Sequence, residues 1–503
     1  MTASQDTLTQ HRPRTRSFLD RLNLQTILLV LVFAGILASA IRPATDPDLW
    51  WHLRTGQLIV QTGAIPHTDP FSFTFQGQPW ITHEWLTEVL IYGLYQLGGY
   101  GLLIITFALM VTAAFVLTYL RCPQASRPYL AALALLLGAF MAAGFVGVRP
   151  QVVSLLFTSV VLFLLDRYRR EAKLRYVLPL PFLMALWVNM HGGYILGIGV
   201  IGVVLAGQFL EWLLARRACS PEQAAASLKP ILVLTAVLLV CNLATLANPN
   251  GVKIWTYPFR TLGDPAIRTY IDEWQSPNFH DPSVLPLLLM ILALIALGMT
   301  GRERVRLPDL LLTLIFAFFA LQSVRHIPLF ALVAVPVLAQ DVISLVQVPA
   351  AVRFPPRWAW LGPVLALAVM ALPVQRLVGY VADQPTAVAA NYPQGAAEWI
   401  LAHRPAGPLF NDYNWGGYLI WRLNLAYPVF IDGRAQDVYT PDFITQYANT
   451  VSGTPGWRDT FERYGIRLAL IQPDTALADA LRHTPGWTVG YEDMQSVVFV
   501  ASG

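Results

Sequence analysis

The chain has 503 residues and a formal net charge of +4 at neutral pH. Only 13% of its residues are charged, against about 25% in soluble domains, and many apolar runs are long enough for membrane-spanning helices. This composition excludes an ordinary soluble protein and indicates a polytopic membrane protein. No basic stripe with interleaved aromatic residues occurs, so nucleic acid is not an expected partner.

The first apolar run covers residues 24–41 and follows a basic N-terminal stretch, residues 1–23. Arg42 and Pro43, rather than the small residues of a cleavage site, come directly after it. We therefore predict an uncleaved membrane anchor, with a cleaved signal peptide as the alternative.

Further apolar runs bring the prediction to about eleven transmembrane helices. Lysine and arginine recur in every second loop, which predicts a cytoplasmic N-terminus, and the bacterial inner membrane is the expected location. An odd number of helices then places the C-terminal segment on the extracytoplasmic side. The expected ranges are 24–41, 99–120, 129–147, 152–166, 176–190, 194–214, 230–247, 284–300, 308–324, 327–346 and 358–378.

Glycine, proline and charge return to soluble levels after the last apolar run, which predicts a membrane domain, residues 24–380, and a separate domain, residues 381–503. Strand-like and helix-like runs alternate in this tail and predict a small α/β layer fold. The expected fold class is thus an α-helical polytopic membrane protein with a C-terminal extracytoplasmic α/β domain. Strands are expected at 408–410, 428–431, 468–471, 488–491 and 497–501, and helices at 395–403, 441–451, 457–464 and 476–482.

The first outer loop, residues 42–98, is rich in acids, histidines and tryptophans. Asp46 and Asp48 stand just before a predicted interfacial helix, residues 49–61. One carboxylate suits a general base, and the other suits a metal ion or a partner cation. Helix capping is the alternative, but a cap needs only one of the two, so at least one is a candidate catalytic residue.

A second amphipathic helix is predicted at residues 84–97, after a turn. His83 and Glu84 stand at its start and are candidate site residues. A structural alternative exists for Glu84, because Thr82 can cap this helix.

Later apolar runs also carry polar residues at their outer ends, on the same side of the membrane as these acids, which indicates one shared polar site. Arg325 and His326 form the most cation-rich point of that side, and a phosphate leaving group needs such a partner. The alternative is an interfacial arginine that reaches the headgroups. His52 and Arg54 suit phosphate or lipid headgroups. The expected substrate-binding residues are His52, Arg54, His83, Glu84, Arg149, His191, Glu273, Arg325 and His326.

Two glycine-containing motifs of the tail, residues 411–418 and 431–434, follow predicted strands. Ligand binding at strand ends is one interpretation, but we favour tight turns and helix packing for the glycines. Asp69, before a proline in the first outer loop, indicates a turn. The three cysteines lie far apart and predict neither a disulfide framework nor a metal cage.

These residues resemble the motifs of the GT-C superfamily of polytopic glycosyltransferases, and within it the bacterial group related to protein mannosyltransferases and aminoarabinose transferases. Such enzymes carry an acidic motif directly after the first span, then an interfacial helix, a turn and a second helix with a charged motif. Asp46-Pro47-Asp48 occupies the acidic position here, and His83-Glu84-Trp85-Leu86 occupies the second. The sequence departs from the usual Asp-Glu pair and from the usual Glu-Lys-Pro-Pro, and motif-level similarity is confined to the first outer loop.

The resemblance implies an inverting transfer of a sugar from a polyprenyl-phosphate-linked donor, with Asp48 as the base. The charge of the leaving polyprenyl phosphate would be met by Arg325, Arg149 or His326. The sequence names neither the sugar nor the acceptor, which is a lipid, a glycan or a protein, and it leaves the use of a divalent metal open.

Three other functions compete with this interpretation. A ligase for whole lipid-linked glycans would carry its large polar segment late in the chain, between membrane helices. A transporter or flippase would carry charges near helix midpoints and broken helices in repeated halves, whereas the polar groups here collect on one side. A non-catalytic scaffold that displays the tail leaves the acid-rich first loop unexplained.

Overall fold

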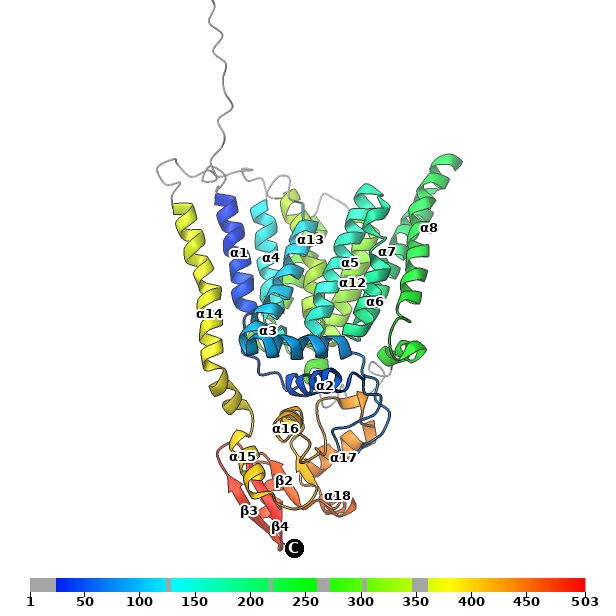
Figure 1. Ribbon diagram of the computed structural model, residues 1–503. Helices are drawn as coiled ribbons and strands as arrows, with labels where there is room; N and C mark the ends of the chain where they lie inside the picture. The colour runs from blue at the N-terminus through cyan, green and yellow to red at the C-terminus, as the bar shows by residue number, and fades with distance from the viewer. Residues whose placement is uncertain are drawn as a thin grey trace, which may run out of the picture.

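The computed structural model describes residues 24–123, 128–216, 220–259, 272–300, 305–345 and 361–502. A bundle of long helices forms one part, and a smaller unit with a β-sheet forms the other (Figure 1). Helix α2 (Leu49–Thr62) and the first part of helix α3 (Trp85–Arg121) run across the end of the bundle, between the two parts (Figure 1). The expected helical membrane bundle and the C-terminal α/β unit are confirmed, and the extracytoplasmic side of that unit stays a prediction.

Each of the eleven apolar ranges contains a helix of the bundle. Eight of the helices described are long and apolar enough to cross a membrane, and three shorter apolar helices cover Ile27–Ala40, Leu174–Met190 and Leu307–Gln322. The number of eleven spans therefore stays a prediction. The bundle helices are α1 (Leu24–Ala40), α3, α4 (Pro128–Ala142), α5 (Gln151–Glu171), α6 (Leu180–Met190), α7 (Tyr194–Ala215), α8 (Pro221–Ala244), α11 (Leu285–Thr300), α12 (Leu307–Gln322), α13 (Ile327–Leu345) and α14 (Leu361–Asn391).

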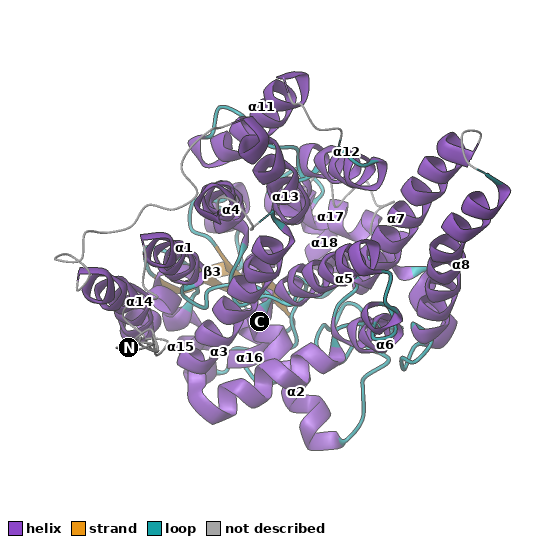
Figure 2. Cartoon of the chain, turned by 90° about the horizontal axis from the view of Figure 1, so that it is seen from above, coloured by secondary structure: helices purple, strands orange, loops and turns teal. Residues whose placement is uncertain are grey.

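Helix α13 lies among α4, α11 and α12 in the view along the bundle (Figure 2). Its residues from Ile327 to Val335 are all buried, because the helix is apolar on every face and is surrounded by protein rather than lipid. The helix begins directly after Arg325 and His326, so packing of α13 fixes the position of these two residues.

A sharp bend divides α3 into the two elements expected from the sequence, an interfacial helix and a span. Gly98 and Gly99 have non-helical backbone angles, and Gly99 lies at φ 57° and ψ −151°, a region that is open to glycine alone. The segment before the bend lies across the bundle and the segment after it runs along the bundle (Figure 1).

Helix α2 is covered by protein on the face that we expected to meet the bilayer. Trp50 and Leu53 are 2% and 0% exposed, and the Trp50 ring packs edge-on against Tyr392 and Tyr418 at centroid distances of 5.3 and 5.2 Å. An apolar helix face predicts burial but does not distinguish lipid from a second domain, which is why the sequence misassigned its partner.

The C-terminal unit contains a four-stranded sheet of order β1-β2-β4-β3, with β1 and β2 parallel and the other pairs antiparallel. Helix α14 continues through residue 381, so the domain boundary, which stays a proposal, lies inside a helix. The predicted helix at 395–403 and three others are confirmed, and α16 was not predicted. The elements are α15 (Gln394–His403), β1 (Leu409–Asn411), α16 (Gly416–Arg422), α17 (Pro441–Val451), α18 (Trp457–Arg463), β2 (Leu468–Ile471), α19 (Ala476–Arg482), β3 (Trp487–Glu492) and β4 (Val497–Ala501).

The strand expected at 428–431 is wrong. Val429 instead pairs with the first outer loop, because its N–H donates to the Phe71 carbonyl and its carbonyl accepts from the Phe73 N–H, both at 3.1 Å. The apolar pattern predicted a buried extended segment, and the segment is buried, but its hydrogen-bond partner is a loop more than 300 residues away in the chain.

A buried arginine fastens the C-terminal unit to the first outer loop. The fully buried Arg434 guanidinium contacts carboxylate oxygens of Asp69 and Asp432 at 2.6 Å each, and it lies over the rings of Phe71 and Trp80. Asp69 also accepts the Phe71 N–H at 2.9 Å, which confirms the predicted turn. The same carboxylate therefore shapes the loop and holds the second domain.

Candidate active site

Arg149 joins the two expected acids of the first loop to a later outer segment. Its guanidinium contacts carboxylate oxygens of Asp46 and Glu273. The Asp48 N–H donates to Asp46 Oδ1 at 2.9 Å, and Trp51 Nε1 donates to Asp48 Oδ1 at 3.0 Å. We call Asp46, Asp48, Arg149 and Glu273 the Arg149 cluster.

The capping interpretation of Asp48 is wrong. Asp48 is the N-cap residue of α2, but its side chain makes no capping hydrogen bond, and the Asp46 carboxylate accepts a backbone N–H instead. Burial, followed by the negative charge of Asp46, raises the pKa of Asp48 well above its usual range. Burial also raises the pKa of Asp46, but the Arg149 charge opposes the shift. Asp48 is therefore the stronger base of the pair.

Glu84 is surrounded by three histidines from three different segments. His83 Nε2 lies 3.0 Å from Glu84 Oε1, His191 Nε2 lies 3.3 Å from the same oxygen, and His52 Nε2 lies 3.6 Å from Oε2. His52 also contacts Glu88 through Nδ1 at 3.4 Å. We call these five residues the Glu84 cluster, and it lies beside the Arg149 cluster because Trp51 and His52 are consecutive residues of α2.

Neighbouring groups fix the protonated nitrogen of His191. The Gly193 N–H donates to His191 Nδ1 at 2.8 Å, so Nδ1 is an acceptor and Nε2 carries the hydrogen that faces Glu84. Ser154 Oγ contacts the same Nδ1 at 2.7 Å and accepts a hydrogen bond from Trp187 Nε1 at 2.8 Å. No sequence pattern indicated Ser154, which lies inside an apolar run.

The capping alternative for Glu84 is wrong as well. The N-cap residue of α3 is Glu84 rather than Thr82, and its side chain makes no capping hydrogen bond. Thr82 Oγ1 donates to the Pro66 carbonyl at 2.5 Å. The Glu84 carboxylate is instead used entirely by the histidines.

The Glu84 cluster holds one ionised pair and two neutral imidazoles. Burial lowers the pKa of His83, but Glu84 and Asp437 outweigh it and raise that pKa to about 9. Burial raises the pKa of Glu84, but His83 and His191 outweigh it and lower that pKa to about 2. Burial lowers the pKa of His52 and of His191 to about 4 each. At neutral pH His83 is thus charged, and the other two histidines are neutral.

These shifts predict that the stability contribution of the cluster is largest near pH 6.5. Because the pKa of His83 is raised, protonated His83 stabilises the folded state. This stabilisation is complete below pH 6.5, the ordinary pKa of histidine, and is lost as the pH rises to about 9. The pKa values of His52 and His191 are lowered, so the folded state loses stability as the pH falls from 6.5 to about 4. The lowered pKa of Glu84 causes a further loss of stability below pH 4.5.

The loss of the His83 stabilisation above pH 6.5 is measured as the difference in thermal unfolding temperature between wild type and His83→Gln. We expect this difference to shrink as pH rises from 6.5 to 9, with the exposed His403→Gln as the matched control. A difference that stays constant over this range would show that His83 is not charged in the folded state.

Arg325 lies beside both clusters without an ionic partner among the described residues. Its guanidinium lies over the Trp274 ring at 4.4 Å, and no described carboxylate lies within ion-pair distance of it. Its positive charge contributes to the lowered pKa of His191, after burial and His83. The predicted grouping of the outer polar residues therefore includes Arg325.

Two expected residues stand apart from these clusters. His326 lies among the rings of Trp274 and Phe319, at centroid distances of 6.1 and 5.7 Å, and beside the Phe319 backbone. Arg54 NH1 donates to Gln57 Oε1 at 2.6 Å, on the same helix. Their assignment as substrate-binding residues gains no support from the geometry, because neither reaches a carboxylate or histidine of the clusters.

The C-terminal domain supplies residues that the sequence analysis missed. Asp437 Oδ2 lies 3.6 Å from His83 Nδ1 and accepts a hydrogen bond from the Tyr257 hydroxyl at 3.4 Å. Gly433 packs so closely on Asp48 that an added Cβ would collide with its carboxylate. The close packing expected for the glycines of residues 431–434 is therefore present, but its partner is the candidate base.

The described residues contain no group of three or more His, Cys, Asp and Glu side chains arranged to hold a metal ion. In the Arg149 cluster a guanidinium lies between the carboxylates of Asp46 and Glu273 and neutralises the charge that a divalent cation would otherwise balance. These side chains do not fit a divalent metal in this arrangement.

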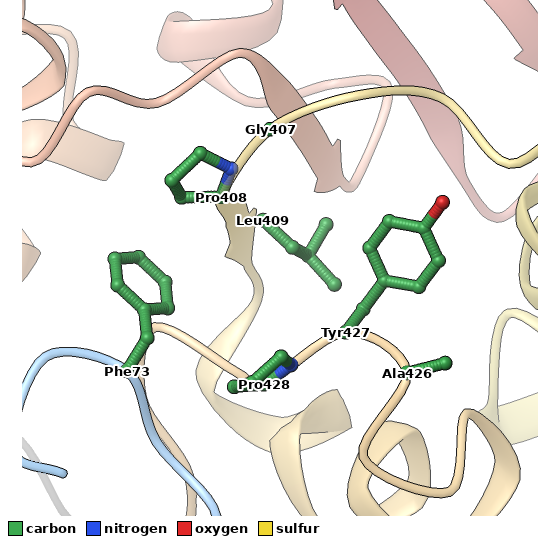
Figure 3. Close-up of a pocket in the computed structure, with 7 residues that line it drawn as sticks. All are labelled: Phe73, Gly407, Pro408, Leu409, Ala426, Tyr427 and Pro428. Carbon is green, nitrogen blue, oxygen red and sulfur yellow. The ribbon is translucent and has the colours of Figure 1, made fainter.

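Two surface hollows of the C-terminal domain lie away from both clusters. One, of about 380 Å³, is lined by apolar side chains that include Phe73, Leu409 and Tyr427 (Figure 3). The other, of about 410 Å³, is lined by polar residues of α17 and α18. Neither contains an expected site residue.

No protein-family model matches this chain, and no curated protein matches it by sequence. Solved structures do match. ArnT from Cupriavidus metallidurans in the apo state is 16% identical, with a TM-score of 0.50 over 95% of this chain and 97% of that chain. The same protein bound to undecaprenyl phosphate is 14% identical, with a TM-score of 0.47 over the same shares.

An archaeal structure matches over a similar share of this chain. The oligosaccharyltransferase AglB from Archaeoglobus fulgidus, in complex with an inhibitory peptide and a dolichol-phosphate, is 11% identical, with a TM-score of 0.50 over 95% of this chain and 74% of that chain. At these identities the likeness to apo ArnT and to AglB shows the fold alone: this chain folds like these two glycosyltransferases, as the resemblance in its first outer loop implied.

Proposed function

We propose that this protein is a membrane glycosyltransferase that transfers a sugar, with inversion, from a polyprenyl-phosphate-linked donor to an acceptor. The observation that carries the proposal is the pairing, within a GT-C fold, of a strongly basic buried carboxylate with a nearby arginine that has no ionic partner in the described part of the chain. A base and a free cation are the two groups that this displacement needs.

Asp48 acts as the base. The acceptor oxygen attacks the anomeric carbon, the bond from that carbon to the phosphate oxygen breaks, and the polyprenyl phosphate leaves with the electron pair. Asp48 takes the proton of the acceptor. Its raised pKa suits this role, because a carboxylate with a raised pKa holds the transferred proton more firmly.

Asp46, Arg149 and Glu273 position the base. Arg149 is engaged by two carboxylates, so it is poorly placed to bind a phosphate as well. The negative charge of Asp46 raises the pKa of Asp48. Asp46 and Asp48 therefore have different roles, because Arg149 contacts the carboxylate of Asp46.

Arg325 binds the phosphate of the donor. Its guanidinium faces the Trp274 ring rather than a carboxylate, and a guanidinium is well suited to hold phosphate oxygens. Among the matched structures, AglB is in complex with a dolichol-phosphate, which supports a lipid phosphate as the ligand class. A site at the end of the bundle lets the isoprenoid chain stay in the bilayer.

The protein resides in the bacterial inner membrane, with its N-terminus in the cytoplasm and the C-terminal domain, residues 381–503, on the extracytoplasmic side. The arginine-rich loops of the sequence support this orientation. Helix α2, the start of α3 and the C-terminal domain lie at the same end of the bundle (Figure 1). Both clusters include residues at α2, and Asp437 of the C-terminal domain reaches His83, so transfer takes place on the extracytoplasmic face.

The test is the release of polyprenyl phosphate by purified protein in lipid, from a panel of polyprenyl-phosphate sugars. We expect wild type to release it, and Arg325→Gln to weaken the binding of undecaprenyl phosphate roughly 10- to 100-fold, the loss typical of a hydrogen bond to a charged group. Arg458→Gln is the matched control, because Arg458 also lies over a tryptophan ring but on the exposed face of α18.

No release across the panel would reject the glycosyltransferase. Movement of the lipid across the membrane without cleavage would instead support a flippase. Release by wild type together with unchanged lipid binding in Arg325→Gln would keep the enzyme but move the phosphate site elsewhere.

A further inference from the structure

The segment 431–439 of the C-terminal domain touches both clusters. Arg434 anchors it to the first outer loop through Asp69, Gly433 lies against the Asp48 carboxylate, and Asp437 reaches His83. The segment has little freedom to move, because the fully buried ion pairs of Arg434 hold its middle. The C-terminal domain therefore forms part of the wall of the candidate active site.

The two carboxylate oxygens of Asp437 differ in their hydrogen bonding. Oδ2 accepts the hydrogen bond from Tyr257 and faces His83. Oδ1 is buried in a side chain that is only 9% exposed, and it has no hydrogen-bond partner among the described residues. A buried acceptor without a donor is costly and rare in folded proteins, so such an atom in a functional site marks the place of a ligand's donor.

The neighbours of Asp437 indicate which ligand group lies there. Arg325 interacts electrostatically with Tyr257 and Glu84, and the Tyr257 hydroxyl contacts Asp437, so a sugar attached to a phosphate at Arg325 can reach Asp437. The Tyr257 ring lies 4.1 Å from the His83 ring, centroid to centroid, at an angle of 30°, and an aromatic ring is a suitable neighbour for the apolar face of a sugar. A carboxylate accepts hydrogen bonds but repels a phosphate, so the partner is a hydroxyl of the sugar.

We propose that Asp437 is a substrate-binding residue, supplied by the C-terminal domain, whose free carboxylate oxygen accepts a hydrogen bond from a hydroxyl of the transferred sugar. This inference rests on the proposed function and deepens it, because it assigns sugar recognition to a domain outside the membrane bundle. The membrane part binds the lipid phosphate, and the C-terminal domain distinguishes what the lipid carries.

The experiment compares binding of undecaprenyl phosphate with binding of undecaprenyl phosphate linked to a hexose, a pentose or an N-acetylhexosamine, by protein in lipid nanodiscs. We expect wild type to bind at least one sugar-bearing lipid more tightly than the bare lipid. Asp437→Asn should bind the preferred sugar-bearing lipid roughly tenfold more weakly than wild type does, the loss typical of one hydrogen bond to a charged group. Its affinity for the bare lipid should be unchanged. Asp459→Asn, an exposed acid of the same domain, is the control.

Deoxy versions of the preferred donor separate recognition from a structural role. One deoxy donor should bind wild type as weakly as the intact donor binds Asp437→Asn, and the variant should not distinguish the two. Thermal unfolding checks that Asp437→Asn is folded, and Asp437→Glu serves as a second variant that keeps the carboxylate.

Three results would overturn the inference. They are a full sugar preference in Asp437→Asn, an equal loss of affinity for the bare lipid, and a wild type without any preference for a sugar-bearing lipid. Failure of the proposed function is a separate result, since it is read from the release of polyprenyl phosphate by wild type.

Discussion

Asp48→Asn should lower the rate of sugar transfer by roughly 10²- to 10⁴-fold, the range that a general base contributes. Asparagine has the shape of aspartate and can still accept the hydrogen bond from Trp51, so the fold should persist, whereas the amide cannot take the acceptor proton. The measurement is the initial rate of polyprenyl phosphate release at saturating donor, with thermal unfolding as the check of folding.

Asp459→Asn is the matched control, because it makes the same chemical change on the exposed face of α18. Transfer in wild type should also rise with pH as Asp48 loses its proton, and the midpoint should lie above the ordinary range of aspartate because the pKa of Asp48 is raised. An unchanged rate in Asp48→Asn, together with a large loss in Asp46→Asn, would make Asp46 the base.

Arg434→Met should destabilise the protein by about 3–5 kcal/mol, the cost of breaking a buried ion pair. Methionine leaves the carboxylates of Asp69 and Asp432 without their cation in a site that is fully buried. We expect a lower thermal unfolding temperature, and we expect limited proteolysis to separate the C-terminal domain from the bundle earlier than in wild type.

Arg482→Met provides the contrast. Arg482 pairs with Glu492 on the surface, where the two side chains are 32% and 39% exposed, and such pairs contribute about 0–1 kcal/mol. Equal effects of the two variants would show that Arg434 does not hold the domains together. Replacing Asp69 and Asp432 by asparagine in the Arg434→Met background should recover part of the loss, because the unpaired charges are then removed.

The sequence predicted well those elements that depend on short stretches of chain. Helix α17 and strand β4 have the bounds expected from their apolar patterns. The bend at Gly98 and Gly99 divides α3 where one pattern ends and the next begins. A helix period or an alternating strand pattern lies within a dozen residues, so these predictions needed no knowledge of packing.

The candidate site was predicted in part. Counting the apolar runs predicted that Asp46, Arg149 and Glu273 lie on the same side of the membrane. In the structure Arg149 contacts both acids. His52, Glu84 and His191 meet in the same way. His326 and Arg54 share the same side but not the clusters, because topology assigns a residue to one side of the membrane without fixing where its side chain points.

The sequence by itself determined the membrane bundle, the charged first loop and the α/β tail, since each depends on local composition and period. Only the tertiary structure decided which acid remains free of an arginine, and that Asp437 reaches His83 from the C-terminal domain. His83 and Asp437 lie hundreds of residues apart in the chain, and no pattern in either segment records the other. Their contact exists because the buried charges of Arg434, Asp69 and Asp432 must be paired with one another, which holds the C-terminal domain against the first outer loop.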